Sequence, residues 1–398
     1  MRVRVGVALL LIVVAAAAIN YLRPIPAVAA TPTLRSTDVI PGTAPTLPWP
    51  ARGAAAVGVS GLGFIASSGN EQAIPAASVT KVMTALLLLR DDPLPVGGSG
   101  PAYTVTDADV RTYQTDLGQG QSVVRVEAGE RLTEMSLLQG MLIPSANNYA
   151  EMVARWNGAG SIDAFVAKMN ERAAALKMTH THFADPAGAS PQSVSTPTDL
   201  LILGLTAMKD PVFASIVAMP QVDLPVAGTV YNVDGVLGQN GIVGIKTGSG
   251  LNTGANFLFA SNQTVDNHAI TIVGCVMGQP TLSAAFAAAK ALIAAVAPAL
   301  HVRRVIARNQ SVATYTTPWG NGTDVVSQSD LDLAEWPGLI LRQRLNAGPL
   351  TFDHSLPAGS YVGTEHVVLG DYNVDVSLVT TAPMYPPGRF WRLTRVAF

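Results

Sequence analysis

Cysteine is nearly absent from this sequence. Cys275 is the single cysteine among 398 residues, so no disulfide can form within the chain. It lies in the apolar run 269–277, where we expect a small buried thiol rather than a nucleophile. Charged residues are also scarce, at 13%, and the net charge is −2. Nucleic-acid-binding proteins carry strong basic patches, so this composition indicates no nucleic-acid partner.

Signatures of several other enzyme classes are missing as well. There is no G-x-S-x-G elbow of the kind that presents the nucleophile in α/β-hydrolases. No glycine-rich phosphate loop follows a predicted strand. His180 and His182 form an H-x-H, but no third ligand follows at a suitable spacing. We therefore expect neither a metal nor an organic cofactor.

The N-terminus carries an export signal. Arg2 and Arg4 precede an apolar run over residues 5–19. Fifteen apolar residues suit a signal peptide better than a membrane span, which needs about 20. The small residues 27–29 offer a cleavage site but lie rather far from the run, so an uncleaved anchor over residues 1–30 is the alternative. In both cases we expect an extracytoplasmic protein of the cell envelope, either secreted or associated with the membrane through its N-terminus.

Composition divides the rest of the chain into three parts. Residues 31–50 are rich in proline and threonine and predict an extended linker. Residues 51–300 alternate strand-like and helix-like patterns and predict a catalytic domain. Residues 301–398 contain turn signals and paired apolar runs, including 364–369 and 372–379, and predict a small β domain. We expect the tail over 390–395 to form a closing strand.

The pattern within residues 51–300 predicts an α+β fold. We expect a hairpin over 54–67, a helix over 78–90, helices over 132–180 interrupted at Pro144, strands over 242–246, 256–261 and 269–277, and a turn over 248–254 joining the first two of these strands. The alanine-rich run 284–300 contains Lys290 and Pro298 and predicts a packed helix rather than a second span. The result is a sheet flanked by helices, with an all-helical insertion in the middle.

Two of the six lysines lie in short motifs that need them. Ser78 and Lys81 form an S-x-x-K, and Lys246 opens a K-T-G. Between them Ser145 and Asn147 form an S-x-N. Each motif alone is weak, but their order and their placement at a helix start, a helix interruption and a strand end point to one site.

Serine is a poor nucleophile until a base takes its proton. If a helix begins near Ser78, Lys81 lies one turn further on and points from the same face. A lysine accepts a proton only when its pKa is depressed, which burial and a neighbouring cation both achieve. Lys246 is the candidate neighbouring cation. The pattern predicts an enzyme that acylates its own serine.

These motifs resemble those of the low-molecular-mass penicillin-binding proteins of the D-alanyl-D-alanine carboxypeptidase family, which are serine peptidases of bacterial wall metabolism. Coverage runs roughly from residue 54 to residue 398. The resemblance extends to segments around and beyond the motifs, at residues 75–84, 141–148, 178–188, 241–248 and 356–363. It implies a transpeptidase/β-lactamase-like catalytic domain followed by a small β domain.

The resemblance also implies roles for the remaining motif residues. Ser145 would relay a proton to the leaving amine, and Asn147 would hold the substrate amide or Lys81. Thr247, Gly248 and Ser249 would bind substrate, with a terminal carboxylate on Lys246 and Thr247. The oxyanion would be held by the backbone N–H groups of Ser78 and Ser249. No arginine occurs between 172 and 303, so carboxylate recognition rests on this K-T-G-S segment.

As partners the resemblance implies peptidoglycan stem peptides ending in D-Ala-D-Ala and, as mimics of them, β-lactam antibiotics. The expected activity is a serine-type carboxypeptidase. A D,D-endopeptidase has the same catalytic residues and is one alternative. A β-lactamase and a non-catalytic penicillin-sensing or wall-binding protein are the others. The extra β domain argues against a β-lactamase, and the intact motifs weigh against a sensor.

Overall fold

The structure is a computed structural model that describes residues 2–69, 72–250 and 253–395. The chain divides into two compact units. The larger unit comprises Thr43–His301, and the smaller one combines Met1–Gly42 with Val302–Phe398. The smaller unit is therefore built from both ends of the chain.

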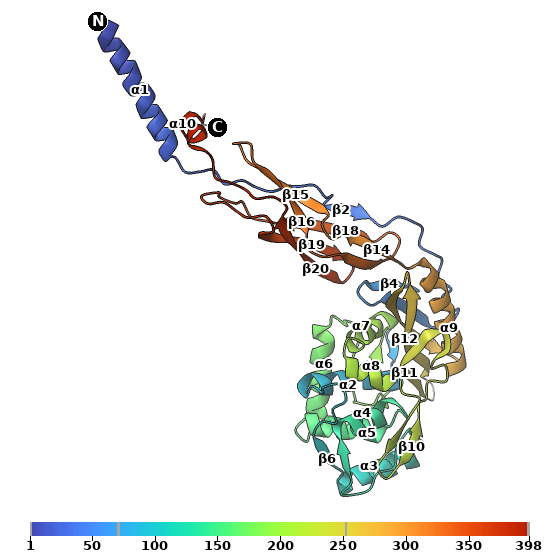
Figure 1. Cartoon of the computed structure of the whole chain (residues 1–398). Coiled ribbons are helices and arrows are strands. Elements are labelled where there is room, and N and C mark those ends of the chain that lie inside the picture. Colours follow the sequence, from blue (N-terminus) through green and yellow to red (C-terminus); the bar gives the residue numbers. More distant parts are fainter. Residues whose placement is uncertain (1, 70–71, 251–252, 396–398) are drawn as a thin grey trace. The chain divides into compact units, whose positions relative to one another are not determined.

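A five-stranded antiparallel sheet forms the centre of the larger unit (Figure 1). Its order is β11-β12-β13-β3-β4, with β3 at Ala54–Val59, β4 at Gly63–Ser67, β11 at Ile242–Gly250, β12 at Gly254–Val265 and β13 at His268–Gln279. The hairpin and the three strands expected from the sequence are confirmed. Strand β11 runs beyond the K-T-G as far as Gly250, and part of the expected turn over 248–254 lies outside the described residues.

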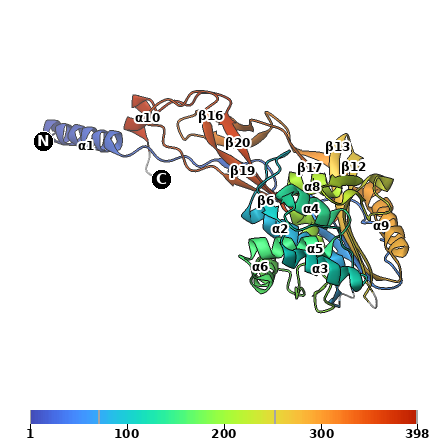
Figure 2. The ribbon, with the colours of Figure 1, turned by 90° about the horizontal axis from the view of Figure 1, so that it is seen from below.

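The two faces of this sheet carry alternate residues of each strand and are covered by different helices. Helix α9 (Leu282–Val296) covers one face, where Phe286 packs edge-on against Phe257 of β12 at 4.9 Å between ring centroids. Helix α7 (Pro197–Ala207) covers the other face, where Gly204 lies against Leu258 and Val273. Both views place α9 on the opposite side of the sheet from α2, α4 and α5 of the same unit (Figures 1 and 2). The helix α9 was expected from the alanine-rich run, and it packs on the sheet.

The helical insertion lies between β4 and β11 and contains short strand pairs as well as helices. Its elements are β5 (Ile74–Pro75), η1 (Ala77–Thr80), α2 (Lys81–Asp91), β6 (Ala102–Thr104), α3 (Asp107–Gly118), β7 (Arg131–Thr133), α4 (Glu134–Leu142), α5 (Asn147–Asn157), α6 (Ile162–Ala175), β8 (Val194–Ser195), α7, α8 (Pro211–Val217), β9 (Gln221–Leu224), β10 (Gly228–Tyr231) and η2 (Gln239–Gly241). The expected interruption at Pro144 is present between α4 and α5. Helix α2 is almost wholly buried and packs on α5, α6 and α7.

The smaller unit contains a seven-stranded sheet in the order β1-β15-β16-β20-β19-β18-β2, and a two-stranded sheet of β14 and β17. The strand bounds are β1 at Thr31–Pro32, β2 at Thr37–Val39, β14 at His301–Ile306, β15 at Ser311–Thr316, β16 at Gly322–Ser327, β17 at Leu331–Glu335, β18 at Ile340–Asn346, β19 at Tyr361–Leu369 and β20 at Tyr372–Thr380. A short η3 (Ala297–Ala299) precedes β14. The hairpin expected around residues 364–379 is confirmed as β19 and β20.

The segment over residues 31–50 differs from the extended linker that its composition predicts. Its strands β1 and β2 form the two edges of the seven-stranded sheet, paired with β15 and β18. An edge strand hydrogen-bonds on one side only, which is why a strand containing Pro32 fits there. The smaller unit reaches Gly42, so the division between the units falls inside the expected linker.

The closing strand expected over 390–395 is wrong. These residues form the short helix α10 (Arg389–Thr394). The two edge strands of the sheet are β1 and β2, from the other end of the chain. Helix α10 packs instead against α1 (Arg2–Leu22).

Helix α1 is longer than the apolar run from which it was expected. Its segment Arg4–Leu22 has 19 residues and a mean hydropathy of 2.5, and none of it is buried. Among the described residues α1 and α9 are long and apolar enough to cross a membrane, and the bent pair α7–α8 would add a third span if counted as one. Of these helices, α9 and α7 pack on the central sheet.

The packing of α9 gives a stability prediction. Phe257 is fully buried, so Phe257→Ala should lower the free energy of unfolding by about 3–5 kcal/mol, the usual result of removing a buried aromatic ring. Phe64 of β4 is 48% exposed and provides the control. Phe64→Ala should change stability by only about 0.5 kcal/mol. Urea unfolding of both variants measures the difference, and equal losses would contradict this account of the core.

Candidate active site

The segment before Ser78 is fixed by a side-chain amide that binds its backbone. Asn256 of β12 donates hydrogen bonds to the carbonyls of Pro75 (2.9 Å) and Ala76 (3.1 Å). Ala77 then adopts a left-handed φ of 51°, unusual for a residue with a side chain. Ser78 follows in the single turn η1, immediately before α2. This strained connection holds Ser78 at the start of the helix, half-buried.

The amine of Lys81 is in contact with oxygens from three separate segments. Its Nζ lies 2.9 Å from Ser78 Oγ, 2.6 Å from Asn147 Oδ1 and 2.8 Å from the carbonyl oxygen of Ala187. The side chain is fully buried. Two of the three expected motifs, S-x-x-K and S-x-N, are therefore joined directly by Lys81.

The surroundings of Lys81 suit a neutral amine. Burial lowers the pKa of Lys81 well below its ordinary value, and the nearby Lys246 lowers it further, while Asp185 and Asp116 oppose the shift. A neutral amine has two N–H donors and one lone pair. Asn147 Oδ1 and the Ala187 carbonyl can only accept, so they take the two donors. The lone pair then faces the Ser78 hydroxyl, the one partner that can donate.

The S-x-N motif lies where the chain turns from α4 into α5. Ser145 is buried in this turn with a left-handed φ of 69°. Asn147 begins α5, and its backbone N–H donates to the Ser122 carbonyl at 2.8 Å. The structure thus brings Asn147 onto Lys81 and places Ser145 two residues before it.

The K-T-G strand lies beside the turn that carries Ser78. Strand β11 contacts η1, and a methyl group added to Gly248 would lie 2.9 Å from the Ala76 carbonyl oxygen and 3.2 Å from the Ser78 nitrogen. Only a residue without a side chain fits this approach. Thr247 is buried, and Ser249 is exposed at the end of the strand.

Lys246 is 1% exposed, and its charge lowers the pKa of Lys81. Burial lowers its pKa to about 7, against the opposing effect of Asp234. Its Nζ donates to the Thr247 carbonyl at 3.3 Å. Lys246 therefore gains or loses its charge near neutral pH.

Four residues around Lys81 were not singled out from the sequence. Ala187 supplies the carbonyl described above, and Gly188, with φ of 77°, packs so closely that an added methyl group would lie 1.8 Å from the Ala77 carbonyl oxygen. Asn256 fixes the backbone before Ser78. Gln121 accepts a hydrogen bond from Asn147 Nδ2 through its Oε1. Ala187 and Gly188 lie in the segment 178–188 that the resemblance includes, and Asn256 is an amide directly before an apolar run of β12.

Gln121 decides which end of the Asn147 amide faces Lys81. An amide has one accepting and one donating end. With Nδ2 bound to Gln121, Oδ1 is directed at Lys81 Nζ. Gln121 is a positioning residue, because it acts on Lys81 through Asn147.

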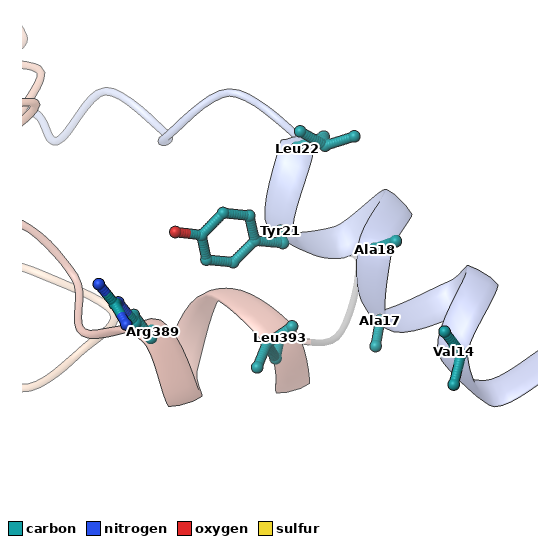
Figure 3. A pocket seen from close by; sticks show the side chains of 7 residues that line it. All are labelled: Val14, Ala17, Ala18, Tyr21, Leu22, Arg389 and Leu393. Atoms are coloured by element: carbon teal, nitrogen blue, oxygen red, sulfur yellow. The ribbon is translucent and has the colours of Figure 1, made fainter.

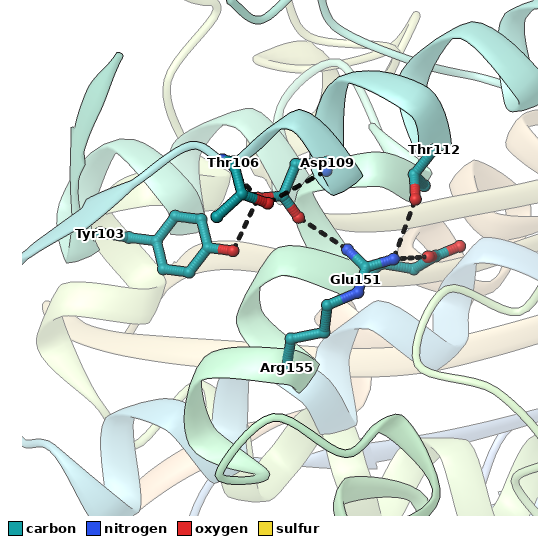
Figure 4. Close-up of polar contacts among 6 residues, drawn as sticks. All are labelled: Tyr103, Thr106, Asp109, Thr112, Glu151 and Arg155. Carbon is teal, nitrogen blue, oxygen red and sulfur yellow. Dashed lines mark hydrogen bonds and ion pairs between the residues drawn. The ribbon is translucent and has the colours of Figure 1, made fainter. Parts of the chain in front are cut away.

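A polar network holds α3 and α5 together (Figure 4). Arg155 of α5 pairs with Asp109 of α3 at 2.8 Å, with Glu151 at 2.7 Å and with Thr112 at 2.9 Å. Asp109 also accepts from the Tyr103 hydroxyl at 2.7 Å. Residues 147, 151 and 155 lie on one face of α5 at a spacing of four residues. This network fixes α3, and with it the loop containing Gln121, against α5.

Among the described residues no group of three or more His, Cys, Asp or Glu side chains is arranged to hold a metal ion. The functional groups that meet at this site are a hydroxyl, two buried amines and an amide. A hydroxyl hydrogen-bonded to an amine of depressed pKa is an arrangement that can generate a nucleophile.

Solved structures of DD-peptidases have the same fold. A Streptomyces DD-transpeptidase is 25% identical with a TM-score of 0.56, and the match covers 64% of this chain and 98% of that chain. Penicillin binding protein 5 from Haemophilus influenzae is 17% identical with a TM-score of 0.61, and covers 86% of this chain and 99% of that one. The fold is thus that of the penicillin-binding DD-peptidases.

The family profile for D-alanyl-D-alanine carboxypeptidase matches residues 58–281, and the chain belongs to this family. A D-alanyl-D-alanine carboxypeptidase of Mycobacterium tuberculosis is 34% identical over 181 residues, which cover 44% of this chain. The match spans 57% of the length of that relative. A D-alanyl-D-alanine endopeptidase of Pseudomonas aeruginosa is 31% identical over 37% of this chain and 44% of its own length.

The contact between Gln121 and Asn147 predicts an effect on acylation by a labelled penicillin. Gln121→Leu leaves the Asn147 amide without its partner, which should slow acylation roughly tenfold or more. Gln121→Glu keeps an acceptor but adds negative charge, so it should raise the pKa of Lys81 and move the acylation rate profile to higher pH. Stopped-flow labelling across pH measures both.

Gln119 provides the matched control, because it is exposed and contacts Gln121 rather than Asn147. Gln119→Leu should label at the rate of the parent protein. If Gln121→Leu is labelled at the rate of the parent protein, or if Gln121→Glu leaves the pH profile unchanged, Gln121 does not position Asn147 for acylation.

Proposed function

We propose that this protein is a serine D,D-carboxypeptidase that removes the terminal D-alanine from peptidoglycan stem peptides through an acyl-enzyme on Ser78. One observation carries the proposal: the fully buried Lys81 amine has two obligate acceptors and the Ser78 hydroxyl as its partners. This set of partners favours a neutral amine whose lone pair accepts the serine proton. Family membership supports the same chemistry.

In the acylation step, the Ser78 proton passes to Lys81 Nζ as Oγ attacks the carbonyl carbon of the D-Ala-D-Ala bond. The backbone N–H groups of Ser78 and Ser249 receive the developing oxyanion. When the tetrahedral intermediate collapses, the C–N bond breaks and Ser145 relays a proton from Lys81 to the leaving amine. Free D-alanine departs and an ester on Ser78 remains.

Hydrolysis of this ester repeats the sequence with water. Lys81 accepts a proton from the water molecule as the water oxygen attacks the ester carbon. Lys81 then returns the proton to Ser78 Oγ as the C–O bond breaks. Asn147, oriented by Gln121, holds the Lys81 amine through both steps. A β-lactam acylates Ser78 Oγ in the same way. Its C–N bond breaks when the lactam ring opens, so no amine is lost at this step.

A carboxypeptidase must recognise a terminal carboxylate, and the K-T-G-S segment provides for this. Lys246 supplies charge, and the hydroxyls of Thr247 and Ser249 supply hydrogen bonds. Gly248 allows the strand to approach Ser78 closely. Because a D,D-endopeptidase has the same catalytic residues, the assay below separates the two activities.

An extracytoplasmic location follows from the proposed substrate, because peptidoglycan is assembled outside the membrane. The apolar helix α1 is compatible with export or anchoring at that side.

A direct assay separates the candidate activities. Purified protein is supplied with a pentapeptide ending in D-Ala-D-Ala, a cross-linked muropeptide dimer and a labelled penicillin. Release of D-alanine from the pentapeptide is the expected result. Cleavage of the dimer alone indicates an endopeptidase. Rapid loss of the penicillin label indicates a β-lactamase, and stable labelling without peptide turnover indicates a sensor.

Substitutions of Ser78 and Lys81 test the proposed roles. Ser78→Ala should abolish labelling and leave the unfolding transition in place, because the side chain is half-buried and small. Lys81→Ala should slow acylation by about 10²–10⁴-fold, the usual contribution of a general base. Labelling at parental rates in either variant contradicts the assignment.

The pKa values of the two lysines predict a bell-shaped pH profile for kcat/KM on D-Ala-D-Ala peptides. Lys81 must lose its proton, so the rate rises with pH through its lowered pKa. Lys246 must keep its proton to bind the carboxylate, and with a pKa of about 7 it loses that charge as pH rises further. The profile of kcat/KM reports groups of the free enzyme, so it should fall above about pH 7.

A peptide amidated at its C-terminus is the control, because it has no carboxylate to bind. Its kcat/KM should lack the fall at alkaline pH. An identical fall for both peptides would show that Lys246 does not recognise the carboxylate.

A further inference from the structure

The C-terminal end of α1 is covered by α10, whereas the rest of α1 is uncovered. The two helices contact each other, and a groove between them is lined by Val14, Ala17, Ala18, Tyr21 and Leu22 of α1 and by Arg389 and Leu393 (Figure 3). The nine positions from 14 to 22 span about 12–13 Å along a helix. Helix α10 therefore lies beside the last turns of α1.

Two arginines of this tail bind the backbone at the end of α1. Arg392 donates to the Tyr21 carbonyl at 2.7 Å, and its guanidinium lies 4.4 Å from the centre of the Tyr21 ring. Arg395 donates to the Asn20 carbonyl at 2.7 Å and to the Pro24 carbonyl at 3.0 Å. It also reaches the Arg23 carbonyl. The last carbonyls of a helix lack partners within it, and cations at that end are favoured by the helix dipole.

These contacts bear on whether α1 is a cleaved signal or a retained anchor. Removal of residues 1–29 would take away all the carbonyl acceptors named above for Arg392 and Arg395. The tail would then keep two exposed cations and lose the helix against which it packs. The contacts favour retention of α1.

Helix α1 as a whole has the length of a bilayer span, and its contact with α10 leaves the segment Arg4–Leu22 exposed. The 19 residues Arg4–Leu22 extend about 28 Å as a helix, close to the thickness of a bilayer core. Their apolar side chains are exposed, including Leu10, Leu11 and Ile12 at 63–65%. Within the part of the chain that the structure describes, α10 is the helix that packs against α1.

Aromatic residues gather where this span ends. Trp391 of α10 packs on Trp319 at 5.1 Å between ring centroids, and Arg395 lies 5.3 Å from the Trp391 ring centre. Phe390 is 79% exposed, and Tyr385 is 52% exposed. Tryptophan and tyrosine prefer the boundary between lipid and water, and exposed apolar side chains beside a span are stabilised there.

Four arginines lie in the segments that form this end. They are Arg23, Arg389, Arg392 and Arg395, and neither residues 19–37 nor residues 376–395 contain aspartate or glutamate. Such a cluster attracts a partner of negative charge. Anionic lipid headgroups attract such clusters at the end of a span, by about 1 kcal/mol for each arginine near the surface.

We propose that α1 remains on the mature protein as a bilayer anchor, and that α10 lies beside its C-terminal end in the headgroup layer of an anionic membrane. Arg392 and Arg395 fix α10 on α1, while Phe390 and Trp391 enter the boundary between headgroups and acyl chains. The smaller unit is thereby attached to the bilayer at both ends of the chain.

The first test measures the intact mass of the full-length chain after export and isolation from the membrane fraction. A mass that includes residues 1–29 is the expected result. A mature protein that begins near residue 30 would overturn the proposal.

The second test places the full-length protein in vesicles of phosphatidylglycerol that carry bromine near the headgroup end of the acyl chains. Bromine should quench the tryptophan fluorescence, and Trp391→Phe should remove much of this quenching. Arg392→Gln with Arg395→Gln should lower the quenching toward the Trp391→Phe level. Vesicles of neutral phosphatidylcholine should give weaker quenching.

The control replaces Arg342 and Arg344 of β18 by glutamine, which removes the same charge at two exposed positions elsewhere in the smaller unit. These variants should quench as the parent protein does. Labelling by penicillin verifies in each case that the larger unit is folded. Quenching that is unchanged in Trp391→Phe, or equal losses in both arginine pairs, would show that α10 does not lie at the bilayer.

Discussion

The buried amine of Lys81 is the group around which the larger unit is arranged. An amine removed from water is destabilising unless its hydrogen-bonding groups find partners. Here the partners come from the turn at Ser78, from α5 at Asn147 and from the loop at Ala187. Each lies on a different segment, so the site forms only when all three are packed. Asn256, Gly188 and Gln121 hold those segments in place.

Two buried lysines have different roles in the proposed mechanism. Both have a lowered pKa because both are buried, and the pKa of Lys81 is lowered further by Lys246. In the proposed mechanism Lys81 acts as a neutral base and Lys246 as a cation. The charge on Lys246 therefore adds to the effect of burial in keeping Lys81 neutral. Substrate carboxylate on Lys246 would in turn favour the charged form of that lysine.

The smaller unit shows how the N-terminal segment becomes part of a C-terminal fold. Strands β1 and β2 are the two edge strands of its sheet, and the tail forms α10 against α1. Edge strands of two and three residues, one of them containing Pro32, also discourage pairing with other chains.

The sequence alone determined the features that depend on local pattern and on order along the chain. An apolar run predicted β13, and paired apolar runs predicted the hairpin of β19 and β20. The spacing of Ser78 and Lys81 predicted one shared helix face. Only the tertiary structure decided the partners of Lys81 at Ala187, the amide contact of Gln121, and the strands formed by residues 31–39. Those contacts join positions that are far apart in sequence, and a hydrogen bond across such a distance leaves no periodicity to read. The helix α10 was also decided by the tertiary structure. A segment of six residues is too short to be a stable helix alone, and it packs against α1.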